Sequence, residues 1–274
     1  MRNRIWLHLF FYALSVAGAQ PVPATHEKLH AVLWTQTAPE FRGATLQAFR
    51  MARQNLDTAL HDKDWTAAIE QTGDYQRLPP AVVVDIDETI LDNSPSQARM
   101  IERNVEFGAV WDDWVNEASA GEIPGALDFL QYAYARGVTV FYVTNREHSK
   151  HYRGTRRNLE KLGFPLHPSV ETLLMLGARA DWKSEKQSRR KYVAQSYRIL
   201  LLAGDDFGDF LPGVRTSVEK RLEMARPYDS FWGLKWFMIP NATYGSWEEA
   251  PYNFERSAPD HRKLDAKRKA LRGK

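Results

Sequence analysis

The chain has 274 residues, 43% of them hydrophobic and 12% aromatic, which is enough to bury a core in one large domain or two modest ones. The formal net charge of +3 is too small to indicate a nucleic-acid polymer as a partner. There is no cysteine, which excludes disulfides and a lipidated N-terminal cysteine. The composition therefore indicates a globular protein that is stabilised by packing and by any metal it binds.

Residues 1–19 are typical of a secretory signal peptide. Arg2 and Arg4 precede an apolar run over residues 5–17, and small residues end the run. The run is too short to span a bilayer, so we predict a cleaved signal, a periplasmic or secreted protein, and no stable membrane anchor after cleavage. An uncleaved anchor or a buried helix is the alternative.

The next segment, residues 26–72, is predicted to be helical and to cover the sheet. Its apolar residues recur at helical spacing in a short helix and then in a longer one that ends near Asp62. Thr37 is expected to cap the longer helix, with Pro39 in its first turn and Glu40 at the capping-box position.

The chain is organised around AVVVDIDETILDNSP, residues 81–95. Small and β-branched residues without alternation at 81–84 predict a strand that is covered on both faces in a parallel sheet. Asp85 and Asp87 follow it, and because alternate side chains of a strand share a face, both carboxylates project together from its end. Two like charges this close indicate a metal, a shared proton, or both, although the motif alone also occurs in turns.

Residues 94–123 are expected to form a small, mainly helical cap that packs on the core. The segment is aromatic and acidic, with Phe107, Trp111 and Trp114 at helical spacing. On composition alone, Trp111 is interpreted as a core residue. A further helix is predicted over residues 126–135, between a Pro-Gly start and a glycine stop.

The next predicted strand, residues 138–143, ends in Thr144, Asn145 and Arg146. A threonine at the end of a buried strand is positioned either for a ligand or to cap the following helix. Arg146 could pair with an anion.

Two more apolar strands are predicted, over residues 171–176 and 198–203. The second continues into GDDFGDF, which puts Asp205 and Asp209 at its end. Lys183 lies between these strands at the start of a charged helix, and taken alone it is interpreted as a surface residue.

The C-terminal part contains a candidate edge strand at residues 238–241 within an aromatic segment that includes Tyr244. This segment is either a hydrophobic lid or ordinary packing. Residues 256–274 carry eight Lys or Arg against two Asp, which is typical of a solvated or frayed end; binding to an anionic surface is the alternative.

Strands that alternate with helices predict an α/β fold with a parallel sheet. Right-handed crossovers put the carboxyl ends of parallel strands at one edge of the sheet. The side chains expected to meet there are those of Asp85, Asp87, Thr144, Lys183, Asp205 and Asp209.

With these motifs the chain resembles the HAD (haloacid dehalogenase) superfamily, and more closely the class C acid phosphatases, which include bacterial lipoprotein e and related 5′-nucleotidases. The matching stretches are VVVDIDETILDNSP (82–95), VFYVTNR (140–146), KSEK (183–186), LLAGDDFGDF (201–210), PNATYGSWE (240–248) and AVLWTQTAPEF (31–41). The resemblance implies a HAD-like Rossmannoid domain over residues 20–255, a helical cap and phosphomonoester hydrolysis.

The resemblance also implies catalytic roles. Asp85 would attack phosphorus to form an aspartyl-phosphate, and Asp87 would protonate the leaving oxygen and later deprotonate water. Thr144 would hydrogen-bond the phosphoryl group, and Lys183 would neutralise it.

By the same resemblance, Mg²⁺ would bind Asp85, Asp205 and the backbone carbonyl of Asp87, with Asp209 in support. The residues expected to bind the substrate are Asn145, Arg146, Trp111 and Tyr244. Stacking on aromatic rings tolerates many leaving groups, so nucleoside monophosphates with broad specificity are expected.

Two positions depart from the family pattern: Ser96 stands where a tyrosine is common, and Asp206 where Asn or Thr is usual. Pocket shape and metal affinity are expected to depend on them. We therefore predict an exported, Mg²⁺-dependent acid phosphatase that acts on small phosphomonoesters and can form a homodimer. The alternatives are a phosphotransferase and a periplasmic relative that binds a phosphorylated ligand without cleaving it.

Overall fold

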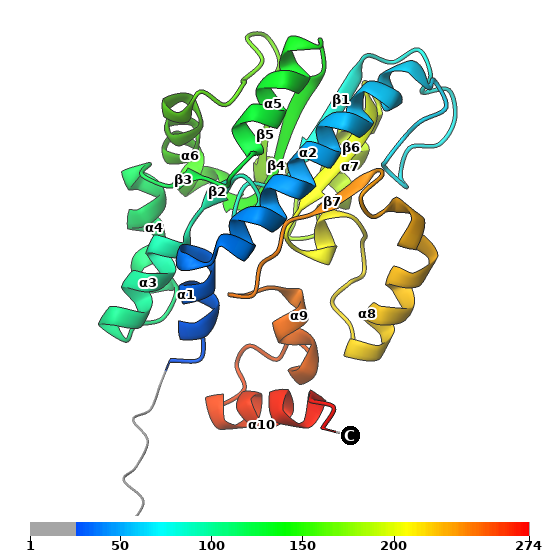
Figure 1. Ribbon diagram of the computed structural model, residues 1–274. Coiled ribbons are helices and arrows are strands. Elements are labelled where there is room, and N and C mark those ends of the chain that lie inside the picture. Colours follow the sequence, from blue (N-terminus) through cyan, green and yellow to red (C-terminus); the bar gives the residue numbers. More distant parts are fainter. Residues whose placement is uncertain (1–25, 274) are drawn as a thin grey trace, which may run out of the picture.

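The computed structural model describes residues 26–273 and is built on a five-stranded sheet (Figure 1). Its order is β5-β4-β1-β6-β7, and all four pairs of neighbours are parallel. The strands are β1 (Pro80–Val84), β4 (Thr139–Glu147), β5 (Leu173–Leu176), β6 (Arg198–Gly204) and β7 (Trp236–Met238). The predicted α/β fold with a parallel sheet is confirmed.

Helices cover both faces of this sheet. The helices of residues 26–273 are α1 (Leu29–Thr37), α2 (Pro39–His61), α3 (Ser94–Arg103), α4 (Gly108–Glu117), α5 (Ala126–Ala135), α6 (His148–Leu162), α7 (Gln187–Ala194), α8 (Val218–Ala225), α9 (Ser246–Glu249) and α10 (Asp260–Ala270). One core joins the sheet to α2, α5 and α6, through residues such as Phe49, Phe129 and Leu159. A second core on the other face contains Val193 of α7 and Trp236.

The start of α2 differs in detail from the prediction. Ala38 is the N-cap residue, and Pro39 occupies the first turn as expected. The hydroxyl of Thr37 instead donates to the carbonyl of Leu33 at 2.7 Å, one turn back in α1. The predicted capping by Thr37 is therefore wrong, because its side chain completes the preceding helix.

The predicted cap segment forms α3 and α4 together with the short strands β2 (Leu91–Asp92) and β3 (Gly121–Glu122), which pair antiparallel. α4 crosses α6 so closely that a Cβ at Gly154 would lie 2.5 Å from the carbonyl oxygen of Val115. This crossing fixes the cap beside the carboxyl end of β4.

The two ends of the chain differ in what can be said of them. The predicted signal peptide lies outside the described residues. Within residues 26–273, no helix has both the length and the apolar character needed to cross a membrane. The basic tail is helical over α10, which packs against a 3₁₀ helix, η3 (Ala250–Tyr252).

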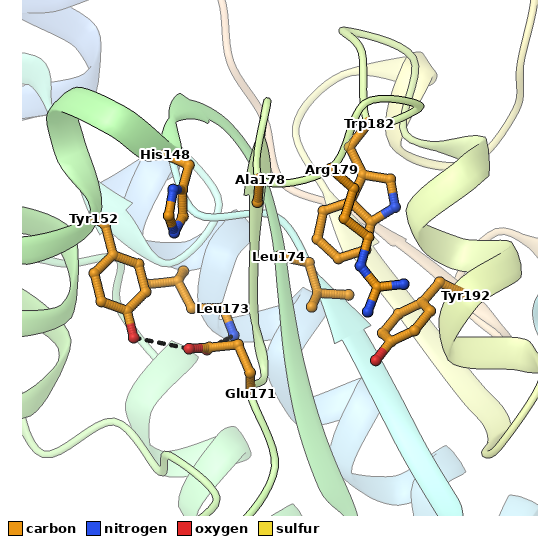
Figure 2. A pocket seen from close by; sticks show the side chains of 9 residues that line it. All are labelled: His148, Tyr152, Glu171, Leu173, Leu174, Ala178, Arg179, Trp182 and Tyr192. Atoms are coloured by element: carbon orange, nitrogen blue, oxygen red, sulfur yellow. Dashed lines mark hydrogen bonds between the residues drawn. The ribbon is translucent and has the colours of Figure 1, made fainter.

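A pocket of about 220 Å³ lies beside the edge strand β5 (Figure 2). His148 and Tyr152 form one wall and Arg179 and Trp182 another, and the hydroxyl of Tyr152 donates to Glu171 at 2.8 Å. The pocket contains none of the predicted site residues.

Candidate active site

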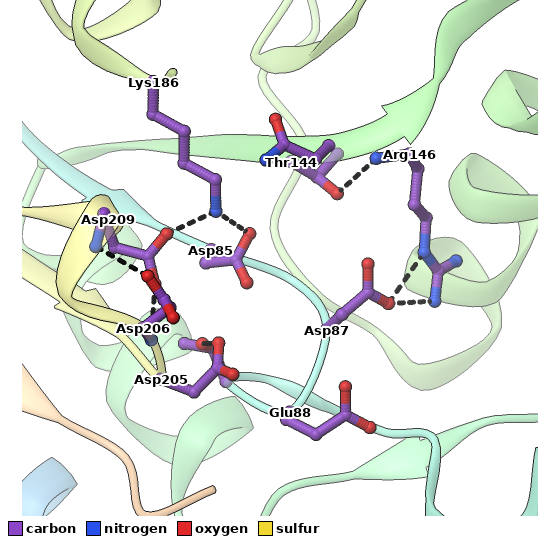
Figure 3. Close-up of polar contacts among 12 residues, drawn as sticks. Asp85, Asp87, Glu88, Thr144, Arg146, Lys186, Asp205, Asp206 and Asp209 are labelled. Carbon is purple, nitrogen blue, oxygen red and sulfur yellow. Dashed lines mark hydrogen bonds and ion pairs between the residues drawn. The ribbon is translucent and has the colours of Figure 1, made fainter. Parts of the chain in front are cut away.

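Three carboxylates gather where β1 and β6 end (Figure 3). Asp85 follows β1, and its backbone N–H donates to the carbonyl of Ala203 in β6 at 3.0 Å. Asp85, Asp205 and Asp209 each offer a carboxylate oxygen, and these oxygens all lie within 4.8 Å of one another. The predicted meeting of distant acidic residues at the carboxyl edge of the sheet therefore occurs in the structure.

Asp209 reaches this cluster because the chain turns sharply after β6, in the 3₁₀ helix η1 (Phe207–Asp209). The turn is fixed by reciprocal bonds: Gly208 N–H donates to Asp206 at 2.8 Å, and Asp206 N–H donates to Asp209 at 3.0 Å. Any side chain at Gly204 would collide with the Asp209 carboxylate, so this position requires glycine.

Asp206 also accepts from the backbone N–H of Ser246 at 2.6 Å. Its carboxylate therefore joins η1 to the start of α9.

A lysine ammonium lies between two of the carboxylates, but it belongs to Lys186 and not to Lys183. Lys186 is buried, and its Nζ forms ion pairs with Asp85 and, at 2.5 Å, with Asp209. Lys183 is exposed, and its backbone carbonyl accepts from Arg189 at 2.8 Å. The sequence prediction chose the first lysine of KSEK, whereas the turn before α7 directs the second one inward.

The cluster has more negative than positive charge, and its pKa values reflect this. Burial raises the pKa of Asp85 to about 7, the charges of Asp209 and Asp87 add to the rise, and Lys186 opposes it. Burial and the charge of Asp85 also raise the pKa of Asp205 well above its usual range. Carboxylate oxygens are the ligands preferred by hard divalent cations, so the residues present fit such an ion.

Asp87 lies on the other side of the site and is held by two neighbours. Arg146 donates to its Oδ1 from Nη2 at 2.7 Å and from Nε at 2.9 Å, and Asn93 donates to the same oxygen at 2.9 Å. Its other carboxylate oxygen points toward Thr144 (Figure 3).

Arg146 is 2% exposed and also donates to Thr155 at 3.1 Å. Its guanidinium is thus engaged with the protein, which differs from its predicted role in substrate binding.

Thr144 and Asn145 lie at a bulge in the pairing of β4 with β5, which shifts register between Thr144 and Glu147. The buried Thr144 hydroxyl accepts from the backbone N–H of Arg146 at 3.1 Å, so its own proton can be donated elsewhere. Asn145 donates to the carbonyl of Ser184 at 2.9 Å and accepts from Arg189 at 2.6 Å. It therefore connects β4 to the loop that carries Lys186.

The two predicted aromatic residues flank the Asp87 side. The centre of the Trp111 ring lies 5.4 Å from the guanidinium carbon of Arg146. The hydroxyl of Tyr244 donates to the carboxylate of Glu88, and the ammonium of Lys28 lies 5.5 Å from the centre of the Tyr244 ring. Glu88 has a left-handed backbone, with φ of 56°, and burial raises the pKa of its carboxyl well above the usual range.

Several supporting residues were not predicted. Asp205 accepts from Thr89 at 3.0 Å and from Asn241 at 2.8 Å. Thr89, Asn93 and Asn241 all lie in the matching motifs, which was a usable signal. Arg190 pairs with Glu70 at 2.6 Å and donates to the carbonyl of Asp209 at 2.7 Å, and no sequence pattern pointed to it.

The chain matches a family model for the HAD superfamily, subfamily IIIB (acid phosphatase), over residues 13–247. It superposes on the class C acid phosphatase from Bacillus anthracis with a TM-score of 0.79 and 33% identity, covering 90% of this chain and 97% of that one. The tungstate-bound structure of the Bacillus anthracis enzyme has the same TM-score and coverage at 32% identity. The stem 28 kDa glycoprotein of Glycine max is 25% identical over 219 residues, 74% of each chain.

The resemblance inferred from the motifs is thereby confirmed. The family model covers more than half of the chain, and the structural match extends over nearly all of it. The chain belongs to the acid phosphatases of HAD subfamily IIIB, the class C acid phosphatases, and is a phosphomonoesterase of that family.

Proposed function

We propose that the chain is an exported, Mg²⁺-dependent phosphatase that cleaves nucleoside monophosphates and similar small esters through a phosphorylated Asp85. The observation that carries the proposal is the buried Asp85 carboxylate, which lies beside a fixed ammonium at the carboxyl end of the sheet. A new N-terminus at Gln20 in the mature protein would support export, and a retained residue 1 would contradict it.

In the first step, a carboxylate oxygen of Asp85 attacks phosphorus while the bond to the leaving oxygen breaks. Asp87 gives that oxygen a proton. In the second step, Asp87 takes a proton from water, the water oxygen bonds to phosphorus, and phosphate departs as the Asp85–phosphorus bond breaks. The contacts of Asp87 with Arg146 and Asn93 all fall on one oxygen, which leaves the other for proton transfer.

The charge of the phosphoryl group is balanced by donors from two elements. Lys186 supplies a positive charge beside Asp85, and the Thr144 hydroxyl keeps a proton to donate. Trp111 and Tyr244 supply aromatic surface for a base or another ring in the leaving group.

Phosphatases of this superfamily generally use a divalent metal. We infer that Asp85, Asp205 and the backbone carbonyl of Asp87 would hold Mg²⁺, which when bound would supply positive charge to offset that of the phosphoryl oxygens. The raised pKa values of Asp85 and Asp205 support this assignment, since a bound cation would offset both causes of the rise, which are burial first and the neighbouring negative charges second.

Replacing the nucleophile tests the proposal directly. We expect Asp85→Asn to lower turnover of p-nitrophenyl phosphate with Mg²⁺ by about 10³-fold or more, because an amide does not form the acyl phosphate. Asp74→Asn, at an exposed position, is the control and should match wild type. Wild-type turnover by Asp85→Asn would refute the mechanism.

The two lysines of KSEK give a matched pair. Lys186→Met should lower kcat/KM by about 10²–10³-fold, because a fixed cation at the phosphoryl group is lost. Lys183→Met should remain within about twofold of wild type, since the Lys183 side chain is exposed. The reverse order of effects, measured on the same substrate, would return the catalytic role to Lys183.

Metal binding should depend on pH with a definite sign. The Asp85 carboxyl has a pKa of about 7 in the folded, metal-free chain and an ordinary value of 3.8 when unfolded, so its ionisation destabilises the fold progressively as pH rises between them. Mg²⁺ should therefore raise the midpoint of thermal unfolding more at about pH 7.5 than at about pH 5.

Asp205→Asn should strongly reduce this Mg²⁺-dependent shift, whereas Asp74→Asn should retain it. An equal shift at both pH values in the wild-type chain would contradict the assigned metal site.

A further inference from the structure

The basic C-terminal helix makes a connection between segments far apart in the sequence. The Nζ of Lys267 in α10 pairs with Glu27 at 2.9 Å and with Glu248 at 2.7 Å. Glu27 lies just before α1, and Glu248 lies in α9. One ammonium thus joins the first described residues, the last helix and the segment that follows Tyr244.

The segment at Glu27 extends directly to the active site. The next residue, Lys28, donates to the side-chain carbonyl of Gln97 at 3.3 Å and lies over the ring of Tyr244. Gln97 lies in α3 of the cap, one helical turn after Asn93, which holds Asp87.

The segment that contains Glu248 also contacts the active site. α9 begins at Ser246, whose backbone N–H is bound by Asp206 in the turn that also carries Asp209. Tyr244, two residues earlier, donates to Glu88, the neighbour of Asp87. Both segments tied by Lys267 therefore meet at the Tyr244 ring, on the side where the leaving group would lie.

Two other ion pairs of α10 do not connect this helix to another segment. Lys263 pairs with Asp260, and Arg268 with Asp265, within the helix itself. The Lys267 side chain is 23% exposed, and its two partners are 53% and 21% exposed. Pairs this exposed contribute little to the stability of the whole fold, but they can bias the position of a short segment.

We propose that Lys267 is a positioning residue for the leaving-group side of the active site, where it holds Lys28 and Tyr244 in place by fixing Glu27 and Glu248. The inference rests on the proposed phosphatase function. The expected consequence is a larger effect on substrate affinity than on turnover, because the groups it positions contact the leaving group and not the phosphoryl centre.

The test compares Lys267→Met with Lys267→Arg and with Lys269→Met, an exposed lysine on the same helix. For a nucleoside monophosphate with Mg²⁺, Lys267→Met should raise KM by about three- to tenfold and leave kcat within about twofold. Lys267→Arg should restore the wild-type KM because it keeps both ion pairs, and Lys269→Met should match wild type. An unchanged KM in Lys267→Met, or the same rise in Lys269→Met, would overturn the inference.

Hydrogen exchange separates failure of this inference from failure of the proposed function. Exchange in Lys267→Met should increase in peptides over residues 27–32 and 243–249 and stay unchanged in β1 and β6. Unchanged exchange in those two peptides, or an increase throughout the chain, refutes the positioning role. If the wild-type chain hydrolyses no phosphomonoester, the proposed function is wrong, and the exchange pattern alone decides whether Lys267 positions these segments.

Discussion

The structure depends on an electrostatic conflict between three carboxylates and one ammonium. Parallel strands bring Asp85 and Asp205 to one edge, η1 adds Asp209, and Lys186 is the cation that lies between two of them. Burial makes the remaining negative charge costly, which is why the pKa of Asp85 rises to about 7. A site built this way is poor for stability and suited to binding a cation and an anionic substrate together.

The sequence was sufficient to predict the part of this site that regular structure controls. Strands covered on both faces carry unbroken apolar runs, so β1, β4 and β6 could be located in the sequence. The polar residues directly after these runs could then be predicted as site residues. Lys183 was chosen wrongly because it lies in a loop, where no periodicity says which of two nearby lysines turns inward. The path of that loop depends on tertiary contacts, such as those of Asn145 with Ser184 and of Arg189 with Lys183, and it is this path that turns Lys186 inward.

The partners of the arginines could not be predicted for a related reason. Arg146 is buried two residues after the buried Thr144, as alternation along a strand predicts, but alternation does not show that its guanidinium pairs with Asp87. Arg190 forms a fully buried pair with Glu70, from a segment more than a hundred residues away. Charged residues in a helix are expected at the surface, so their burial becomes apparent only when the tertiary partner is known.

The burial of the ion pairs changes from the reaction centre to the rim. The side chains of the cationic partners of Asp85 and Asp87 are at most 9% exposed. Ion pairs buried this deeply keep their geometry, because breaking one would leave a charge without a partner and without water. At the rim, the side chains of Lys267 and its two partners are partly exposed, so water can replace either partner in these ion pairs. The chemistry needs fixed atoms, whereas the segments at Lys28 and Tyr244 need only a bias toward one position, which partly exposed ion pairs can supply. A chain without disulfides can meet both requirements by varying only how deeply its ion pairs are buried.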